Sequence, residues 1–281
     1  MYIITFLVDT IFVGGIFLKS ICIKTNNQNF LKNLLKSLDA SNINNTIFTH
    51  HKFKKYNNII IHYLNNDTDY FVGKISYLLS SSVIDIYENL ILDKIILNNY
   101  FYFADFERDE ILKICVEELK SQSIVYRLQL IINSFYKYFL TNKSAIIEGF
   151  LPFRLSEYIN FLNSIVDSSV NKFIIDNEYL EFINILKSYI KDKPIGANLL
   201  HLIYTKNSST ILDEDENIIE PEIEIFNNKY ISDITFSSND YALNTLLTIV
   251  PKKLMIHTTD TDDEFIHTLQ LIFENRVTIC N

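Results

Sequence analysis

The sequence predicts an α+β fold in which strands and helices occupy different parts of the chain. Alternating or β-branched segments typical of strands cluster near the N-terminus and again in the last third, whereas the middle carries long stretches with apolar residues at helical spacing. With 281 residues, 48% of them hydrophobic and 21% charged, the chain can form one large or two modest globular domains. We expect a small N-terminal α/β unit, a helical middle region and a C-terminal α/β unit with a small sheet.

Residues 1–17 form an apolar extension that precedes the first confident element. No Lys or Arg comes before Lys19 and Asp9 interrupts the apolar run, so the basic start of a signal peptide is missing. The run is also short for a membrane span of about 20 residues. We interpret it as the product of a misassigned start or as a loosely packed strand, with a membrane anchor as the alternative.

Residues 18–66 are expected to form the N-terminal α/β unit. KSICIKT (19–25) alternates in polarity as a half-buried strand does, and NQNFLKNLLKSL (27–38) has apolar residues at helical spacing. NNIIIHYL (57–64) is continuous and β-branched, as in a buried strand, and TIFTHHKFKKY (46–56) is its expected partner.

Residues 67–193 are predicted to be helical. Helical spacing of apolar residues recurs in five segments, which are 75–97, 104–120, 123–140, 153–175 and 177–190. The second should have Asp105 or Ala104 near its N-cap, because acidic residues follow in its first turn. Pro194 forces the residue before it into an extended conformation and Gly196 follows, so we place the main boundary there.

Residues 194–281 are predicted to form an acidic α/β unit. NLLHLIYT (198–205) and STIL (209–212) read as a hairpin, followed by a helix that Pro251 ends and then by strand, helix and strand. Residues 205–281 carry 14 acidic and 5 basic side chains and account for the whole net charge of −9. We therefore do not expect this part to bind the phosphate backbone of a nucleic acid. Solubility is the favoured interpretation, with a basic partner or a cation as alternatives.

The three cysteines, Cys22, Cys115 and Cys280, are odd in number and lack C-x-x-C spacing. This usage is typical of a reducing cytoplasm, and it predicts neither a disulfide framework nor a zinc site. Cys22 and Cys115 lie in apolar periodic contexts, so we expect both in the core.

The segment AIIEGFLPFRLSEYI (145–159) reads as a short strand that turns into a helix. Pro152 suits the first helical position and Gly149 permits a sharp turn, which would place Arg154 in the first turn, against the helix dipole. We expect Glu148 or Glu157 to offset this charge as an ion pair that locks the turn. The alternative is an anion site, in which Arg154 and free helix N–H groups hold a phosphate or carboxylate.

The segment HHKFKKY (50–56) interleaves basic and aromatic side chains. Single-stranded nucleic-acid binders use this combination, and the candidate contacts are Lys52, Lys54, Lys55 and Tyr56. An exposed hairpin connection is the favoured interpretation, and nucleic-acid binding is the alternative.

Two acidic segments suggest metal sites but are better explained otherwise. Asp213, Asp215, Asn217 and Glu224 match positions of an EF-hand, yet Ile218 stands where that loop needs glycine. A solvated acidic turn is expected. In 257–268, Thr261 and Glu264 predict a capping box, with a metal or hydrolytic site as the alternative. No P-loop, G-x-G-x-x-G, H-E-x-x-H or G-x-S-x-G motif is present, so we predict no cofactor and no metal, and the catalytic residues, if any, are unknown.

Three segments together resemble one family. EGFLPFRLSEYI (148–159), NNYFYFADFERDEIL (98–112) and LLTIVPKKLMIHTTDTDDEFIHTLQLIFENRV (246–277) are similar, in order and rough spacing, to signatures of the YtxC-like family of sporulation proteins in spore-forming Firmicutes. The resemblance runs from about Ile21 to the C-terminus. It implies a cytoplasmic bacterial protein with a role in sporulation and transfers no catalytic residues.

We therefore expect a non-enzymatic cytoplasmic protein that acts through contacts with an unknown protein partner in sporulating cells. Two alternatives stay open. One is a nucleic-acid-binding factor that uses residues 50–56, and the other is an enzyme or anion-binding module centred on Arg154.

Overall fold

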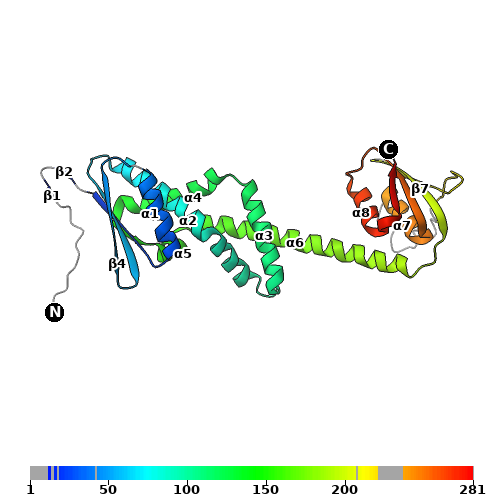
Figure 1. Cartoon of the computed structure of the whole chain (residues 1–281), viewed down its shortest axis with the longest axis horizontal. Coiled ribbons are helices and arrows are strands. Elements are labelled where there is room, and N and C mark those ends of the chain that lie inside the picture. The colour runs from blue at the N-terminus through cyan, green and yellow to red at the C-terminus, as the bar shows by residue number, and fades with distance from the viewer. Residues whose placement is uncertain are drawn as a thin grey trace. The chain divides into compact units, whose positions relative to one another are not determined.

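The fold is α+β, as predicted, with two four-stranded mixed sheets and eight α-helices in the described part of the chain (Figure 1). The computed structural model describes residues 12–13, 16–17, 19–41, 43–206, 208–220 and 237–280. The chain divides into two compact units, Met1–Phe173 and Ile174–Asn281. Each unit has its own hydrophobic core.

The N-terminal sheet has the strand order β4-β5-β3-β6. Its strands are β3 (Lys19–Thr25), β4 (Thr46–Phe53), β5 (Tyr56–Tyr63) and β6 (Ser144–Ile146). The central strand β3 pairs antiparallel with β5 and parallel with β6, which comes from more than a hundred residues later in the chain. The predicted strand pair within 46–64 is confirmed, since β4 and β5 form a hairpin whose turn is Lys54 and Lys55.

The helices of this unit lie on one side of the sheet (Figure 1). They are α1 (Gln28–Ser41), α2 (Thr68–Asn99), α3 (Asp105–Ser121), α4 (Ile124–Thr141), α5 (Ile147–Arg154) and the first part of α6 (Ser156–Lys191). Their apolar side chains share one core with Ile21, Ile23, Ile59 and Ile61 of β3 and β5. These four residues alternate along their strands, so they define the inner face of the sheet.

Ordinary helix-end chemistry sets the helix boundaries of this unit. Asp67 caps α2 by accepting the N–H of Tyr70, and Ala104 is the residue before α3, as predicted. The two helical segments predicted after residue 153 form one helix, α6, which ends at Lys191. Cys22 and Cys115 are both buried. Cys115 belongs to the core, as expected, whereas Cys22 lies between Ile21 and Ile23 on β3 and therefore faces the other side of the sheet.

The C-terminal sheet has the order β10-β9-β7-β8. Its strands are β7 (Ala197–Thr205), β8 (Ser208–Leu212), β9 (Pro251–His257) and β10 (Val277–Cys280), and its helices are α7 (Ser238–Ile249), α8 (Glu264–Phe273) and the short 3₁₀ helix η2 (Glu274–Arg276). The predicted hairpin and the helix-strand-helix-strand order after it are both confirmed. The parallel pairing of β7, β9 and β10 follows from the crossover helices α7 and α8.

One local prediction in this unit is wrong. Helix α8 begins at Glu264 and its cap is Asp263, whose side chain accepts the N–H of Phe265. Thr261 and Glu264 therefore do not form the expected capping box. Asp263 is an equally good cap and stands immediately before the apolar run, so the helix starts later.

The remaining predictions about organisation concern the N-terminal extension, a membrane anchor and the domain borders. Within residues 1–17, the backbone of β1 (Phe12–Val13) pairs antiparallel with that of β2 (Ile16–Phe17), and the rest of that extension lies outside the described residues. No helix among the described residues combines the length and apolarity needed to cross a bilayer. The predicted domain borders at 66/67 and 193/194 stay predictions.

Candidate functional site

The second face of the N-terminal sheet, which we call the outer face, carries the residues that alternate with the core positions. Lys24 of β3 lies beside Asn58 of β5 and Ile146 of β6 in the register of the sheet. Because neighbours at one register position point to the same side, Lys24 and Ile146 both project from the outer face. Lys24 is half-buried there.

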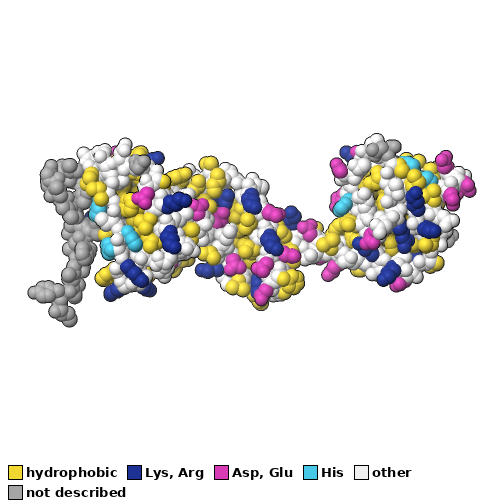
Figure 2. Space-filling view, viewed as in Figure 1, with side chains coloured by type: hydrophobic (Ala, Val, Ile, Leu, Met, Phe, Trp, Pro, Cys, Tyr) yellow, Lys and Arg dark blue, Asp and Glu magenta, His cyan; other side chains and the backbone are white. Residues whose placement is uncertain are grey.

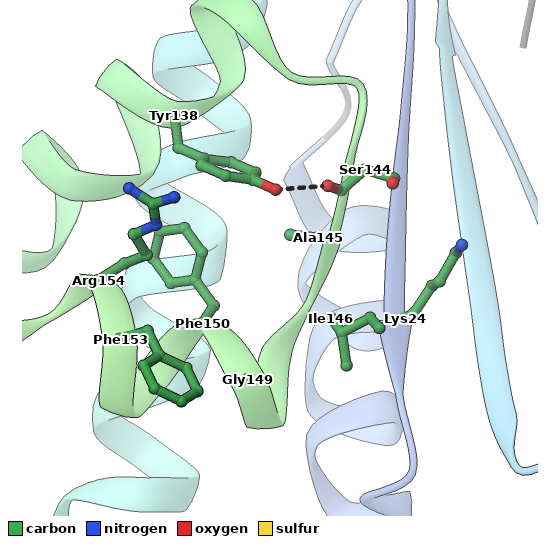
Figure 3. A pocket seen from close by; sticks show the side chains of 9 residues that line it. All are labelled: Lys24, Tyr138, Ser144, Ala145, Ile146, Gly149, Phe150, Phe153 and Arg154. Carbon is green, nitrogen blue, oxygen red and sulfur yellow. Dashed lines mark hydrogen bonds between the residues drawn. The ribbon is translucent and has the colours of Figure 1, made fainter.

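A hollow of about 500 Å³ lies at the β6 edge of this face, and we call it the edge hollow. Tyr138 of α4 and three residues of α5, Phe150, Phe153 and Arg154, lie on one side of it, and β6 with Ile146 and Lys24 lies on the other (Figure 3). The Tyr138 hydroxyl donates a 2.9 Å hydrogen bond to the backbone oxygen of Ser144, which fixes the ring at the rim.

A second hollow of about 440 Å³ adjoins the first, and we call it the hairpin hollow. It is lined by the turn of the β4–β5 hairpin together with the middle of the sheet, namely Phe53, Lys54, Lys55, Tyr56, Asn58, Lys24 and Ile146. Since Lys24 and Ile146 line both hollows, the two join across β3 and β6. Sequence positions near 24, 55 and 150 thus meet on one surface.

The charge on this joined surface is entirely positive among the described residues that line it. Four cations, Lys24, Lys54, Lys55 and Arg154, face the two hollows, and no described lining residue is acidic. None of the four forms an ion pair with a described residue. Figure 2 shows basic side chains gathered at the end of β4 where the hairpin turns. Such a group of like charges attracts anions.

Aromatic rings stand next to three of these cations. The Lys54 ammonium lies 5.7 Å from the centre of the Phe53 ring, the Lys55 ammonium 5.1 Å from that of Tyr56, and the Arg154 guanidinium 5.8 Å from that of Tyr138. These distances are within the range of cation–π attraction. The surface therefore combines positive charge with flat apolar faces.

The predicted helix position of Arg154 is wrong. Helix α5 begins at Ile147 and Arg154 lies in its last turn, with Pro152 inside the helix. At this end the helix dipole favours a cation, so Arg154 does not need a carboxylate to offset a penalty. Pro152 is the sixth residue of α5, so its missing N–H removes one intrahelical hydrogen bond, and the helix ends two residues later at Arg154.

Glu148 faces the opposite side of the sheet from Arg154. Its Oε1 atom accepts hydrogen bonds from the Thr25 hydroxyl at 2.6 Å and from the N–H groups of Asn26 and Asn27 at 2.9 and 3.3 Å. Thr25 is on the inner face, one residue along the strand from Lys24. Glu148 thus ties α5 to the start of α1, and the expected pairing with Arg154 is not formed.

The Glu148 carboxylate also affects Tyr87 of α2. The Tyr87 hydroxyl donates to Glu148 Oε1 at 3.4 Å. Burial, with the charge of Glu148 in second place, raises the pKa of Tyr87 to about 12. This tyrosine therefore stays protonated as a donor in the core.

The structure brings together some of the residues predicted for a site and separates others. Lys54, Lys55, Tyr56, Gly149 and Arg154 line the joined hollows. The other predicted residues, Lys52, Glu148 and Glu157, do not. Lys52 is on the inner-face register of β4, opposite Asn57, because side chains alternate along a strand.

Sequence reasoning missed Lys24, Tyr138 and Phe153 as members of this site. Lys24 occupies a polar position of the alternating segment 19–25, which marks the outer face but not what lies beside it. Tyr138 lies in the predicted helical segment 123–140, and helical spacing does not show that its ring reaches the edge of the sheet. Phe153 is 83% exposed. The sequence signal for it is a phenylalanine directly after Pro152, where an apolar ring is unusual at the surface.

A second surface lies at the corner between α2 and α3, and we call it the aromatic corner. Phe101, Tyr102 and Phe106 are 71%, 63% and 68% exposed. Figure 2 shows hydrophobic and acidic side chains side by side at this corner. Exposed aromatic rings grouped in this way are typical of protein contact surfaces.

Hydrogen bonds hold the aromatic corner in shape. Arg108 donates from Nη1 to the backbone oxygens of Phe101 and Phe103 and pairs with Asp105. The Tyr100 hydroxyl donates to Asp167 at 2.7 Å, and the backbone N–H of Ala104 donates to Glu107. The exposed rings therefore project from a fixed corner, formed by the loop after α2 and the first turn of α3, which reduces the entropy lost on binding.

The two acidic segments have local structural roles. Asp213 Oδ1 accepts the backbone N–H groups of Asp215 and Asn217, which closes a tight turn, and Glu224 lies outside the described residues. His257 forms a 2.9 Å hydrogen bond with His201 across β7 and β9. Among the described residues, no group of three or more His, Cys, Asp or Glu side chains is arranged to hold a metal ion.

Comparison with known proteins places the chain in a family. The model of the YtxC-like family matches residues 73–278, which is most of the chain, whereas the resemblance was expected to start near Ile21. A curated protein of Bacillus subtilis (strain 168), described as uncharacterized protein YtxC, is 24% identical over 132 residues. That match covers 47% of this chain and 46% of the other, so the chain spans about half of the relative it matches. No solved structure matches. The chain therefore belongs to the YtxC-like family.

Proposed function

We propose that the protein is a binding module whose outer sheet face holds a phosphate-bearing anionic ligand. The observation that carries this proposal is the joined pair of hollows, lined by Lys24, Lys54, Lys55 and Arg154 and by no described acid. Four cations held together without a described counter-charge repel one another, and an anion removes that repulsion. A ligand that reaches the half-buried Lys24 is also partly shielded from solvent, which strengthens the attraction.

Pyrophosphate is a simple probe of this function. We expect saturating pyrophosphate to raise the melting temperature of the wild-type protein by a few degrees, because a ligand at about ten times its Kd adds roughly 1.4 kcal/mol. The variant Arg154→Gln should lose most of this shift. Arg154 is exposed, so the substitution should leave the fold intact.

The matched control is Lys94→Gln, which removes one exposed cation of α2 outside both hollows. It should keep the full pyrophosphate shift. An equal shift in Arg154→Gln and Lys94→Gln would show that the anion binds elsewhere, and the absence of any shift in the wild type would contradict the proposal.

We also propose, as a second function, that the aromatic corner binds a partner protein during sporulation. Three exposed rings at a hydrogen-bonded corner between α2 and α3 support a protein contact. The loop lies within the part of the chain that the family model matches. The resemblance to sporulation proteins supplies the process, and a cytoplasmic location is part of the same proposal.

This second function is tested in the cell that encodes the protein. We expect the double variant Phe101→Ser and Phe106→Ser, made in the chromosomal gene, to lower the yield of heat-resistant spores nearly as far as a deletion does. Tyr77→Ser, at a half-exposed position of α2 away from the corner, is the control and should sporulate normally. Immunoblots must show equal protein levels. A deletion with a normal spore yield would rule out the role in sporulation, and a normal yield in the double variant alone would rule out the corner.

A further inference from the structure

The positions of the four cations indicate a ligand with more than one negative charge. Arg154 faces the edge hollow, Lys54 and Lys55 face the hairpin hollow, and Lys24 stands between them in the wall that both share. A phosphate in one hollow leaves the cations that line only the other hollow without a counter-charge. A ligand that uses the whole surface must carry charges in series, at least one for each hollow.

Each hollow also presents one highly exposed phenylalanine. Phe153 is 83% exposed beside the edge hollow, and Phe53 is 62% exposed beside the hairpin hollow. These rings contribute little to the core, and no ring–ring contact of Phe53 or Phe153 is formed among the described residues, although the Lys54 ammonium lies 5.7 Å from the centre of the Phe53 ring. Volumes of about 500 and 440 Å³ are each large enough for a small planar ligand group.

Repeated negative charge with flat rings at intervals is the chemistry of single-stranded nucleic acid. We infer that the outer face binds a single-stranded nucleic acid of two or more nucleotides. Its successive phosphates lie at Arg154 and at Lys54–Lys55, and Lys24 lies between them. This inference rests on the proposed function, because it names the ligand of the same surface. A duplex fits less well, since its bases stack on one another and present only their edges.

The binding should be tolerant of sequence. The polar groups near the hollows are largely occupied by the protein itself, since Tyr138 donates to Ser144 and the Asn58 amide donates to the backbone oxygen of Tyr56. Few groups are left to read the edges of the bases. Stacking and phosphate contacts do not distinguish strongly among bases.

Fluorescence anisotropy with labelled thymidine ligands of increasing length tests the inference. We expect affinity to rise from the mononucleotide to the tetranucleotide and then to level off. Between about 50 and 200 mM salt, the logarithm of the association constant should fall with a slope of about −1.4 or steeper, which corresponds to two or more phosphates on single strands. A duplex of the same length should bind more weakly.

Variants separate stacking from charge. Phe153→Leu should weaken binding of the tetranucleotide about fivefold or more and leave the salt slope unchanged, because it removes a stacking face and no charge. The double variant Lys54→Gln and Lys55→Gln should make the slope shallower by about 0.7, because it removes the contacts to one phosphate of a single strand. Lys94→Gln should change neither quantity.

The outcomes distinguish this inference from the proposed function. If pyrophosphate raises the melting temperature but a tetranucleotide binds no tighter than a mononucleotide, the nucleic-acid inference is wrong and the anion site stands. If neither probe binds, both are wrong. Equal binding of a duplex, or of a polyglutamate peptide of similar charge, would also overturn the assignment to single strands.

Discussion

At the scale of single residues, the ion pairs and buried hydrogen bonds among the described residues stabilise the fold. They leave the cations of the candidate site unpaired. Glu88 of α2 accepts from Arg127 of α4 and from the Tyr158 hydroxyl of α6, and all three side chains are buried. Glu148 is likewise occupied by Thr25 and its neighbours. Neither Glu88 nor Glu148 neutralises the candidate site, and Arg154 forms no ion pair with a described residue.

The buried group of Glu88, Arg127 and Tyr158 gives the first prediction. Glu88→Gln should lower the free energy of unfolding by about 3–5 kcal/mol, because it leaves the Arg127 guanidinium buried without a counter-charge. The Arg127 Nε atom already lacks a hydrogen-bond partner among the described residues, so nothing else there compensates. Urea unfolding followed by circular dichroism measures the loss.

An apolar replacement of the whole group is the control for this prediction. The triple variant Glu88→Leu, Arg127→Met and Tyr158→Phe removes every polar atom of the group together and should lose much less than Glu88→Gln alone. Equal losses in the two variants would show that the charge itself is not what the core needs.

A second prediction at this scale concerns pH. The pKa of Tyr87 is raised to about 12 in the folded protein, against about 10 in an unfolded chain. Between these values the unfolded chain releases the proton and the folded protein keeps it, so stability falls as pH rises from about 10 to about 12 and is complete below about 10. Tyr87→Phe should reduce this slope by up to about 1.4 kcal/mol per pH unit. Superimposable curves for variant and wild type, measured by urea unfolding, would refute the assignment.

At the scale of elements, the β4–β5 hairpin shows a conflict between stability and charge. Its two-residue turn places Lys54 at φ = 54°, in the left-handed region that Gly and Asn adopt more easily. A lysine in this conformation costs conformational energy, so folding alone does not favour lysine at this position. The strained residue lies at the rim of the hairpin hollow, where the Lys54 ammonium group adds to the positive charge of the surface.

This conflict predicts opposite effects of one substitution. Lys54→Asn should leave the free energy of unfolding unchanged or raise it by up to about 1 kcal/mol, because Asn tolerates the left-handed region. The same variant should weaken binding of the labelled tetranucleotide, since it removes one cation from the hollow. Lys55→Asn is the matched comparison, because the φ of Lys55 is not in that region. It should weaken binding without the gain in stability, and a Lys54→Asn variant that binds normally would contradict the role of the turn.

At the scale of the whole molecule, the chain consists of two units with separate cores and different charge. The described cations of the candidate site belong to the first unit, and the acidic residues that set the net charge lie after residue 204. We therefore expect anionic ligands to bind the first unit, while the second is free for other contacts. A substitution that destabilises one core should therefore lower stability mainly within that unit.

The two glycines Gly149 and Gly196 provide a test of this independence. A Cβ atom at Gly196 would lie 2.4 Å from the backbone oxygen of Ile249, so Gly196→Ala should destabilise the second unit by about 1–3 kcal/mol. Gly149→Ala meets nothing within 4 Å and should be neutral or stabilise α5 by about 0.5–1 kcal/mol. Hydrogen exchange should show lost protection in β7 and β9 for Gly196→Ala and unchanged protection in β3 and β5. Equal loss in both units would show that the two cores unfold together.

The sequence by itself determined the local elements and the family. Alternation predicted the strands, helical spacing predicted the helices, and Pro194 and Pro251 marked where helices had ended, because each of these signals acts between residues close in the chain. It also placed Lys54, Lys55 and Arg154 among the candidate residues. It misplaced Arg154 within its helix and paired it with Glu148 or Glu157. Cap positions differ little in free energy, and sequence proximity does not show which sheet face a side chain uses.

Only the tertiary structure decided that two weak candidate sites are one surface. The pairing of β3 with both β5 and β6 sets Lys24 between the hairpin turn and α5, and it lies there because the whole sheet packs one face against the helices. No pattern among residues close together in the chain shows that these side chains lie on one surface. Strand order and register are fixed by the burial of the entire apolar face, which is a property of the folded chain and not of any one segment.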